Sequence, residues 1–209
     1  AAPTAEGAHP FFVHINFRSD VPDRYMPTEE LIDNGFAVLS FGYEDVTRDD
    51  GDFTSGLAGV LYENGKRAPH DAGKIALWAW AAMRCMDYAE HDERLDCAKS
   101  VVCGHSRLGK TALLTAALDT RFAFGYSNDS GCAGAALFRG KKGEQLDDIY
   151  RQFPFWFSES FGQYVGKTDA LPFDQHYLLA SIAPRYVYVA SATGDDWADP
   201  ASELLSCYA

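Results

Sequence analysis

The sequence predicts an α/β fold in which a mostly parallel sheet carries helices on both faces. Two observations lead to this fold class. Short β-prone runs alternate along the chain with helix-prone segments, which is the element order of parallel sheets with covered faces. One run, ending in Val101 and Val102, leads through a Gly-x-Ser turn straight into a helix-prone stretch. That strand–turn–helix arrangement is the context in which a nucleophile elbow forms in α/β enzymes.

The first half of the chain supplies two predicted strands, at residues 11–17 and 36–43, and two predicted helices, at residues 25–34 and 72–88. In the first strand the apolar side chains alternate, which places them on one face: Phe11, Val13, Ile15 and Phe17. Gly35 ends the first helix. The second helix is strongly apolar, and we expect it to bury both Trp78 and Trp80 against the sheet. Between the strand at 36–43 and the helix at 72–88, residues 47–71 are polar and show no hydrophobic periodicity.

The second half continues the alternation, with strands predicted at 98–103, 121–127 and 186–192, a helix at 111–118, and an aromatic-rich insertion at 141–161. We expect that insertion to form helices above the functional site. No repeat, low-complexity tract or linker interrupts the chain, and 209 residues with 47% hydrophobic content can bury a sizeable core. The sequence therefore predicts one domain over residues 1–209. Because its last segment lacks a closing strand, we expect truncation at the C-terminus, and truncation at the N-terminus stays open.

The turn Gly104-His105-Ser106 predicts a nucleophilic serine. A sharp turn lifts the Ser106 hydroxyl clear of the sheet edge, and Gly104 leaves room for the tight backbone crossing. The first amides of the following helix then point to where negative charge develops during acyl transfer. The alternative interpretation of Ser106 is an ordinary helix N-cap.

Two aspartates are candidates for the acid that would orient a catalytic imidazole. Asp129 follows the strand at 121–127, and Asp195 lies in the loop after the strand at 186–192. Both loops come at the carboxyl ends of strands, where reacting groups gather in open parallel sheets. A carboxylate there can hold an imidazole in the correct tautomer. The alternative roles are turn formation for Asp129 and helix capping for Asp195.

Four separated segments of the chain resemble the glucuronoyl esterases, particularly the bacterial members, and they occur in the same order as in that family. They span residues 100–203 and read Gly-His-Ser-Arg-Leu-Gly-Lys, Ser-Asn-Asp-Ser-Gly-Cys-Ala-Gly-Ala-Ala, Leu-Pro-Phe-Asp-Gln-His-Tyr-Leu-Leu-Ala-Ser-Ile-Ala-Pro-Arg, and Asp-Trp-Ala-Asp-Pro. The glycine displaced by one position after the serine is the spacing of the family. The resemblance implies an α/β-hydrolase-type three-layer sandwich. It also implies a secreted or periplasmic serine esterase that cleaves 4-O-methyl-glucuronic acid esters in plant cell-wall glucuronoxylan.

By position, the resemblance makes Ser106 the nucleophile and assigns Arg107 to the oxyanion site. Three further residues fall where the family contacts the uronic acid sugar: Lys110, Glu144 and Trp197. Asp129 stands where many members carry a catalytic glutamate, one methylene longer. Asp195 lies where some members place their acid, so both acids stay open. No cofactor and no metal are implied.

The family's catalytic histidine lies well downstream of Trp197, and none of the six histidines in this sequence is an obvious substitute: His9, His14, His70, His91, His105 and His176. We expect the base beyond Ala209. Two other functions stay open. A carbohydrate acetyl esterase or generic carboxylesterase would use Ser106 without needing Lys110 and Glu144. An inactive carbohydrate-binding relative would lack the histidine altogether.

Charge limits the partners. A net charge of −12 argues against binding to nucleic acid, because phosphate repulsion would dominate, and against anionic membrane surfaces. No apolar run is long enough to cross a bilayer. The first residues lack a basic region followed by an apolar one, so a signal peptide is absent or already removed. The oligomeric state is not predicted.

Overall fold

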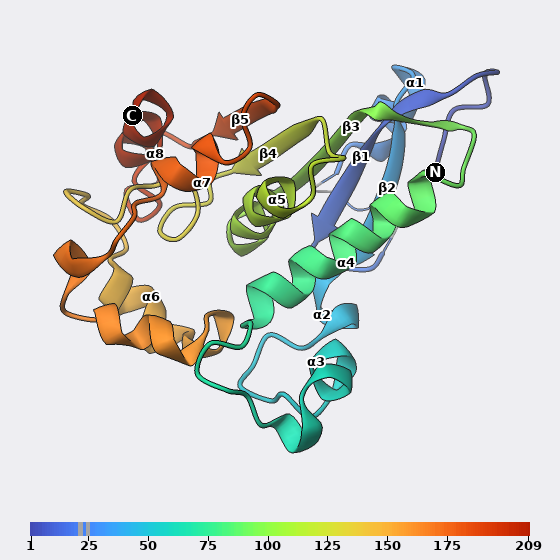
Figure 1. Cartoon of the computed structure of the whole chain (residues 1–209). Coiled ribbons are helices and arrows are strands. Elements are labelled where there is room, and N and C mark those ends of the chain that lie inside the picture. The colour runs from blue at the N-terminus through green and yellow to red at the C-terminus, as the bar shows by residue number, and fades with distance from the viewer. Residues whose placement is uncertain (21–22, 24–25) are drawn as a thin grey trace.

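The computed structural model describes residues 1–20, 23 and 26–209 (Figure 1). Five strands lie within this part of the chain: β1 (His9–Asn16), β2 (Ala37–Gly42), β3 (Leu95–His105), β4 (Phe124–Asn128) and β5 (Tyr186–Ala190). The α-helices are α1 (Thr28–Asp33), α2 (Tyr43–Val46), α3 (Gly56–Leu61), α4 (Lys74–Ala89), α5 (Arg107–Leu118), α6 (Leu146–Gln152), α7 (His176–Ala180) and α8 (Pro200–Tyr208). Short 3₁₀ turns are η1 (Glu63–Gly65), η2 (Pro154–Trp156), η3 (Glu159–Tyr164) and η4 (Thr168–Ala170).

The strands form one sheet in the order β2-β1-β3-β4-β5, and all of the described strand pairs are parallel. The chain moves outward from β1 to β2 and then returns past β1 to add β3. This reversal makes the carboxyl ends of β1 and β3 a topological switch point, which is where open parallel sheets bind ligands. The strand register aligns the ends of the next strands there as well, pairing His105 with Asn128 and Asn128 with Ala190.

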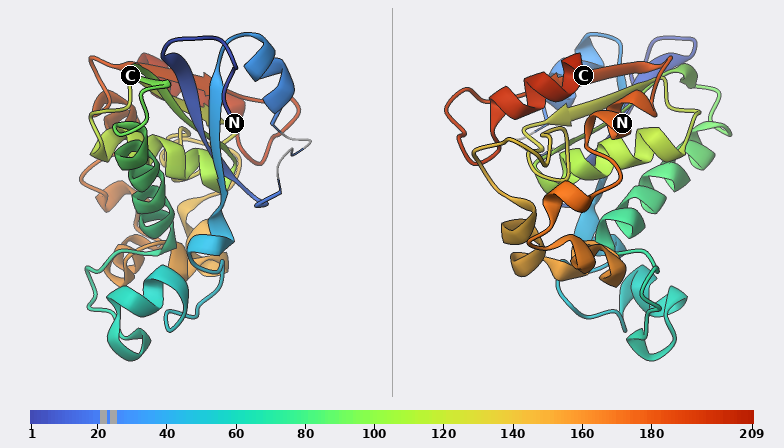
Figure 2. Two further views of the ribbon diagram at one scale, coloured as in Figure 1. Left: turned by 90° about the vertical axis from the view of Figure 1, so that its right-hand side faces the viewer. Right: turned by 60° about the vertical axis from the view of Figure 1, so that its left-hand side comes forward.

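Helices cover both faces of the sheet (Figure 2). α4 and α5 pack against β1, β3 and β4 over the main core, which includes Phe11, Trp78 and Leu113. α1 lies against β2 on the opposite face, where Leu31 packs on a smaller cluster of Met26, Val38 and Cys103. The predicted three-layer α/β fold is therefore confirmed.

The first predicted strand is correct in its apolar face, since Phe11, Val13 and Ile15 are fully buried. It ends at Asn16, so Phe17 lies just outside it. The predicted helix at 25–34 was partly wrong: α1 covers Thr28–Asp33, and Tyr25 lies outside the described residues.

The apolar helix at 72–88 corresponds to α4, with one correction. Trp78 is fully buried, but Trp80 is 43% exposed and faces Arg84 on the outer side. The reason is the helical period, because two positions correspond to about 200° of rotation and the two indoles must point in opposite directions. Burial of Trp80 was therefore a wrong prediction.

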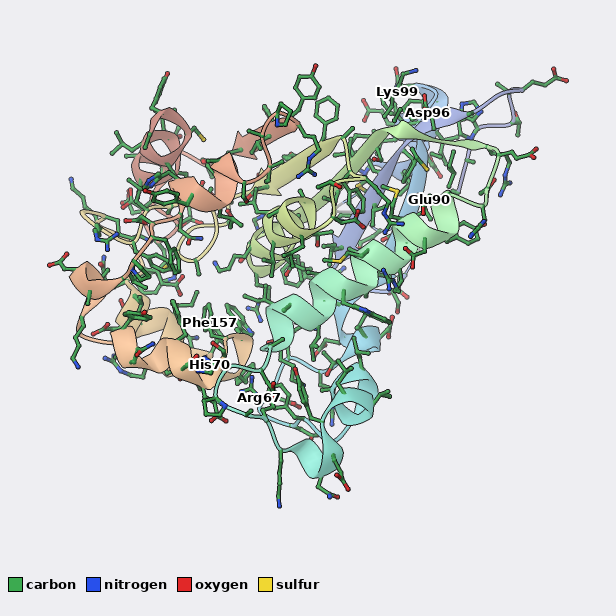
Figure 3. The ribbon with its side chains drawn as sticks, in the orientation of Figure 1. Arg67, His70, Glu90, Asp96, Lys99 and Phe157 are labelled. Atoms are coloured by element: carbon green, nitrogen blue, oxygen red, sulfur yellow. The ribbon has the colours of Figure 1, made fainter. Side chains whose placement is uncertain are left out.

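The polar stretch 47–71 contains local structure that its sequence pattern did not indicate. It holds α3 and η1, and it is tied to the aromatic insertion (Figure 3). Arg67 donates to the carbonyls of Ala72 and Phe157, each at 3.1 Å. The insertion itself forms α6, η2 and the start of η3, as predicted.

None of the helices in the described ranges combines the length and apolar character that a membrane crossing requires.

Candidate active site

Ser106 sits in a strained turn between β3 and α5. Its backbone has φ 57° and ψ −124°, in the region that non-glycine residues rarely adopt and that costs about 1–3 kcal/mol. The Ser106 amide donates to the carbonyl of Asn128 at 2.9 Å, so the β3–β4 ladder extends into the turn. Such strain at a strand-to-helix turn is the geometry of a nucleophile elbow, which presents a serine hydroxyl at the top of the sheet.

Two glycines make this turn possible. A Cβ on Gly104 would lie 2.3 Å from the carbonyl oxygen of Leu108, far inside contact distance. A Cβ on Gly109 would lie 3.1 Å from the Cβ of Ser130 and from the carbonyl oxygen of Gly104. Gly109 therefore lets α5 pack closely against the loop after β4. The helix also begins at Arg107, one turn earlier than the predicted start at residue 111.

One cleft of about 230 Å³ lies beside this turn, at the carboxyl ends of the strands. All of the site residues predicted from the sequence line it: Ser106, Arg107, Lys110, Asp129, Glu144, Asp195 and Trp197. They come from α5, the loop after β4, the segment before α6 and the loop after β5. The structure therefore brings together side chains that are up to 91 positions apart in the sequence.

Lys110 and Glu144 both line this cleft and are largely buried, with exposed fractions of 6% and 7%. Burial lowers the pKa of Lys110, and the nearby Glu144 carboxylate opposes that shift. Burial likewise raises the pKa of Glu144, while Lys110 counteracts it. Lys110 Nζ also donates to the carbonyl of Ser130. Two groups of opposite charge that are held away from water can recognise polar groups of a ligand without competition from solvent.

Trp197 stands at the rim, with 56% of its surface exposed, and is tied to the segment that carries Glu144. The amide of Glu144 donates to the carbonyl of Trp197 at 2.9 Å. An exposed indole fixed at its backbone offers a flat apolar face to a ligand.

Arg107 points its guanidinium into a group of aromatic rings. It lies 4.9 Å from the ring centroid of Trp156 and 5.3 Å from that of Phe153. Its Nη1 forms an ion pair with Asp49. Its Nε is buried and has no hydrogen-bond partner within the described ranges, so this donor is not used by the protein itself.

The two candidate acids differ in what their carboxylates already bind. Asp129 has φ 52°, and its Oδ1 accepts from the amide of Ala192 at 3.2 Å. The Oδ1 of Asp195 accepts from the amides of Trp197 at 3.1 Å and Ala198 at 3.0 Å. Asp195 thus organises the turn that carries Trp197, in addition to lining the cleft.

Several cleft residues were missed by the sequence analysis: Ser130, Gly131, Gln152, Phe153, Trp156 and Ala198. Glu203 of α8 was missed too, although it holds two of them. It is fully buried, and its Oε1 accepts from the Ser130 hydroxyl at 3.1 Å and the Gly131 amide at 2.7 Å. The aromatic richness of residues 141–161 was a usable signal for Phe153 and Trp156, but nothing local marks Glu203.

No histidine lines the cleft within the described part of the chain. His105 is exposed, with Nδ1 3.1 Å from Nδ2 of Asn128, and it borders a neighbouring cavity of about 700 Å³ that also touches Ser106. His14 borders that cavity as well, and burial lowers its pKa to about 4. The described ranges also hold no group of three or more His, Cys, Asp or Glu side chains placed to bind a metal ion.

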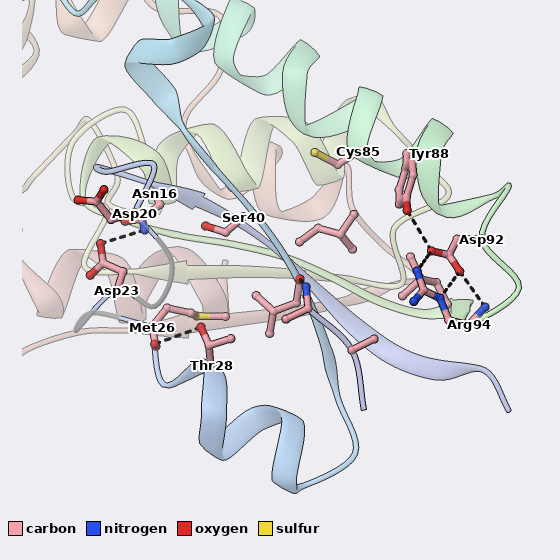
Figure 4. A pocket seen from close by; sticks show the side chains of 15 residues that line it. Asn16, Asp20, Asp23, Met26, Thr28, Ser40, Cys85, Tyr88, Asp92 and Arg94 are labelled. Atoms are coloured by element: carbon pink, nitrogen blue, oxygen red, sulfur yellow. Dashed lines mark hydrogen bonds and ion pairs between the residues drawn. The ribbon is translucent and has the colours of Figure 1, made fainter. Parts of the chain in front are cut away.

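Another cavity, of about 430 Å³, is lined by residues of β1, β2 and the end of α4, among others (Figure 4). Asn16 donates to Asp23 there at 3.1 Å, and Tyr88 and Arg94 both bond to Asp92. None of the predicted site residues lines this cavity.

Comparison with known proteins gives consistent matches. The model of the family described as "Glucuronyl esterase, fungi" matches residues 2–209. Carbohydrate esterase MZ0003 from an unknown prokaryotic organism is 44% identical over 180 residues, which cover 85% of this chain and 42% of the relative. A 4-O-methyl-glucuronoyl methylesterase from Podospora anserina is 30% identical over 206 residues, covering 93% of this chain and 40% of the relative.

Among solved structures, a CE15 glucuronoyl esterase from Teredinibacter turnerae superposes with a TM-score of 0.91 and 32% identity. The match covers 99% of this chain and 55% of that structure. The chain thus spans less than half the length of the two curated relatives described above.

Proposed function

Because this chain belongs to the glucuronoyl esterase family, we propose that it is a serine esterase that hydrolyses esters of 4-O-methyl-glucuronic acid in plant cell-wall glucuronoxylan. One observation carries the proposal. A strained Ser106 opens onto a cleft that is also lined by a buried lysine, a buried glutamate and an exposed indole. The relative from Podospora anserina is a 4-O-methyl-glucuronoyl methylesterase, which supports the choice of ester.

In the proposed reaction, the Ser106 hydroxyl attacks the carboxyl carbon of the ester while a base removes its proton. The carbonyl oxygen becomes an oxyanion, which the amides at the start of α5 and the Arg107 guanidinium stabilise. The C–O bond to the alcohol breaks, and the base returns its proton to the leaving oxygen. Water then attacks the acyl-enzyme in the same way, releasing the uronic acid and restoring Ser106.

We assign the base to a histidine outside residues 1–209, as the family resemblance implies, and its orientation to Asp129, with Asp195 as the alternative. Asp129 follows β4 directly, and its carboxylate accepts one backbone amide from the β5 loop. It therefore has acceptor capacity left for an imidazole N–H.

The sugar would lie against the part of the cleft lined by Lys110, Glu144 and Trp197. Lys110 and Glu144 can exchange hydrogen bonds with its hydroxyl groups, and the Trp197 indole can pack on its C–H face. A simple acetyl ester offers nothing to these two charged side chains, and burying each of them costs free energy. This arrangement favours a uronate ester over a generic carboxylic ester. We also propose that the protein acts outside the cytoplasm, where such plant material is met.

A comparison of two substrates tests the proposal. The complete protein should hydrolyse methyl 4-O-methyl-glucuronate with a kcat/KM at least about a hundredfold above that for methyl acetate, which has the same leaving group, since remote sugar contacts stabilise only the substrate that carries the sugar. Equal values for both esters would favour a generic carboxylesterase. Binding of the sugar acid without turnover of either ester would favour an inactive carbohydrate-binding relative.

A further inference from the structure

We propose that Asp49 is a positioning residue for Arg107, holding the guanidinium where it serves the reacting carbonyl. The inference rests on the proposed function, because it concerns the same cleft. Asp49 is not among the residues that line the cleft, and it lies in the loop after α2. It therefore acts through the cleft residues that it contacts, and Arg107 is its charged partner among them.

The Asp49 carboxylate is enclosed by three donors, one from the nearby Tyr43 and two from the distant Arg107 and Trp156. Its Oδ2 pairs with Nη1 of Arg107 and accepts from the Tyr43 hydroxyl at 3.0 Å. Its Oδ1 accepts from the indole Nε1 of Trp156 at 2.6 Å. Only 7% of the Asp49 side chain is exposed, against 27% for Arg107. A buried carboxylate with three donors is fixed in orientation, and the partner it holds is fixed with it.

The donors are themselves held by packing. Tyr43 is buried and packs edge-on against Trp78, with ring centroids 4.9 Å apart. Trp156 is also buried, and its ring stacks on Phe153 at 3.9 Å. The Arg107 guanidinium lies near both of these last two rings. Asp49 thus belongs to a rigid core structure that reaches the cleft at Arg107, Phe153 and Trp156, and Arg107 is the one of these three that carries a charge.

This geometry has an electrostatic cost, which makes the proposal testable. An ion pair with Asp49 reduces the positive potential that Arg107 projects toward an oxyanion. If Asp49 served only to neutralise Arg107, its removal would speed the reaction. If it positions Arg107, its removal slows the reaction, because a mobile guanidinium must be ordered in each transition state.

The experiment measures kcat and KM of the complete protein with Asp49→Asn, with Arg107→Ala and with both changes. Methyl 4-O-methyl-glucuronate and p-nitrophenyl acetate are both used, since Arg107 would act on the carbonyl of either ester. We expect Asp49→Asn to lower kcat about tenfold to a hundredfold, less than the loss of a whole oxyanion donor. We expect KM to stay within about twofold, as for an interaction that matters only in the transition state. In the Arg107→Ala background, the second change should cost less than about twofold.

Asp174→Asn is the matched control. Asp174 is equally buried, pairs with Arg139 at 3.2 Å and accepts from the amide of Phe138 at 2.6 Å, but it does not line the cleft. It should lower the melting temperature and leave kcat unchanged. Should Asp49→Asn fail to fold, Tyr43→Phe keeps the ion pair and removes one bond to the same Asp49 oxygen. It should then lower kcat about twofold to tenfold, again only when Arg107 is present.

A kcat unchanged or raised in folded Asp49→Asn overturns the proposal. So does a loss that persists undiminished in the Arg107→Ala background, or an equal loss of kcat in Asp174→Asn. If the wild-type protein hydrolyses only p-nitrophenyl acetate, the proposed substrate is wrong, but the role of Asp49 is still tested on that ester.

Discussion

The amide of Glu144 donates to the carbonyl of Trp197 at 2.9 Å, which joins the segment before α6 to the loop after β5. Asp199 strengthens the same junction, since its Oδ2 accepts from the amide of Lys142 at 2.7 Å while its Oδ1 caps α8 through Ser202 at 3.1 Å. One wall of the cleft is therefore built from two segments that hold each other in place. Changes to the backbone at this junction should affect substrate binding even without altering a cleft side chain.

Gly143→Ala tests this junction. A Cβ there would lie 2.2 Å from the carbonyl oxygen of Trp197 and 2.6 Å from that of Asp196, so the two segments must separate. We expect a loss of stability of about 1–3 kcal/mol, as for overpacked sites, and a larger effect on KM for the glucuronate ester than on kcat. Thermal unfolding and steady-state kinetics measure the two effects.

Gly194→Ala is the control for that change. Gly194 lies in the same loop as Trp197, and a Cβ there would meet nothing within 4 Å. It should leave both KM and the melting temperature unchanged. Similar KM values for the two alanine variants would contradict the proposed role of the junction.

The proposed sugar contacts of Trp197 and Lys110 predict different effects of their substitution on two substrates. Trp197→Ala and Lys110→Met, the latter keeping the side-chain volume, should each raise KM for methyl 4-O-methyl-glucuronate about tenfold. Neither should change hydrolysis of p-nitrophenyl acetate by more than about twofold, because that ester has no sugar to bind. Trp80→Ala removes an exposed indole on α4 that does not line the cleft. This control should change neither the KM for the glucuronate ester nor the hydrolysis of p-nitrophenyl acetate. Equal losses of kcat/KM on both esters would show that Trp197 and Lys110 support folding rather than sugar recognition.

The two acids can be ranked by amide substitution. We expect Asp129→Asn to lower kcat by about 10³-fold or more, because an amide stabilises the wrong imidazole tautomer. Asp195→Asn should lower kcat only a few-fold, since its amide oxygen can still accept from Trp197 and Ala198. Measured kcat values in the reverse order would assign the catalytic acid to Asp195.

The stability of the protein should depend on Asp199 at low pH. Burial alone would raise the pKa of this carboxyl, but the amides of Lys142, Ser202 and Gly143 hold the pKa below its ordinary value. A pKa that is lowered on folding gives stability that is present above the unfolded pKa of about 3.9 and is lost as pH falls through the folded one. The difference in unfolding free energy between wild type and Asp199→Asn should therefore be constant above about pH 5 and shrink below about pH 4. A difference that is constant from pH 7 to pH 3 would contradict this assignment.

The parts of the site that sequence analysis could predict are those with a local signal. Gly104, Ser106 and the flanking strand and helix lie within a few residues of each other, so the turn is encoded where it forms. The helix start was placed a turn too late because Gly109 lowers helix propensity, whereas close packing against the loop after β4 overrides that preference.

Asp49 could not be predicted because its partner lies 58 residues away. The segment from residue 44 to residue 52 contains several acids, and nothing in its pattern distinguishes Asp49 from Asp45 or Asp50. Only the fold decides which of them faces Arg107. The same holds for Glu203, whose burial depends on the place of α8 beside two loops.

The most direct test of the proposed function is hydrolysis of methyl 4-O-methyl-glucuronate by the complete protein with Ser106→Ala. Removing a nucleophilic serine should lower kcat by about 10⁴- to 10⁶-fold. The melting temperature should stay close to that of the wild type, because the change deletes one oxygen at a half-buried turn. A folded Ser106→Ala protein that keeps more than about a tenth of the wild-type kcat would contradict the assignment of Ser106 as the nucleophile.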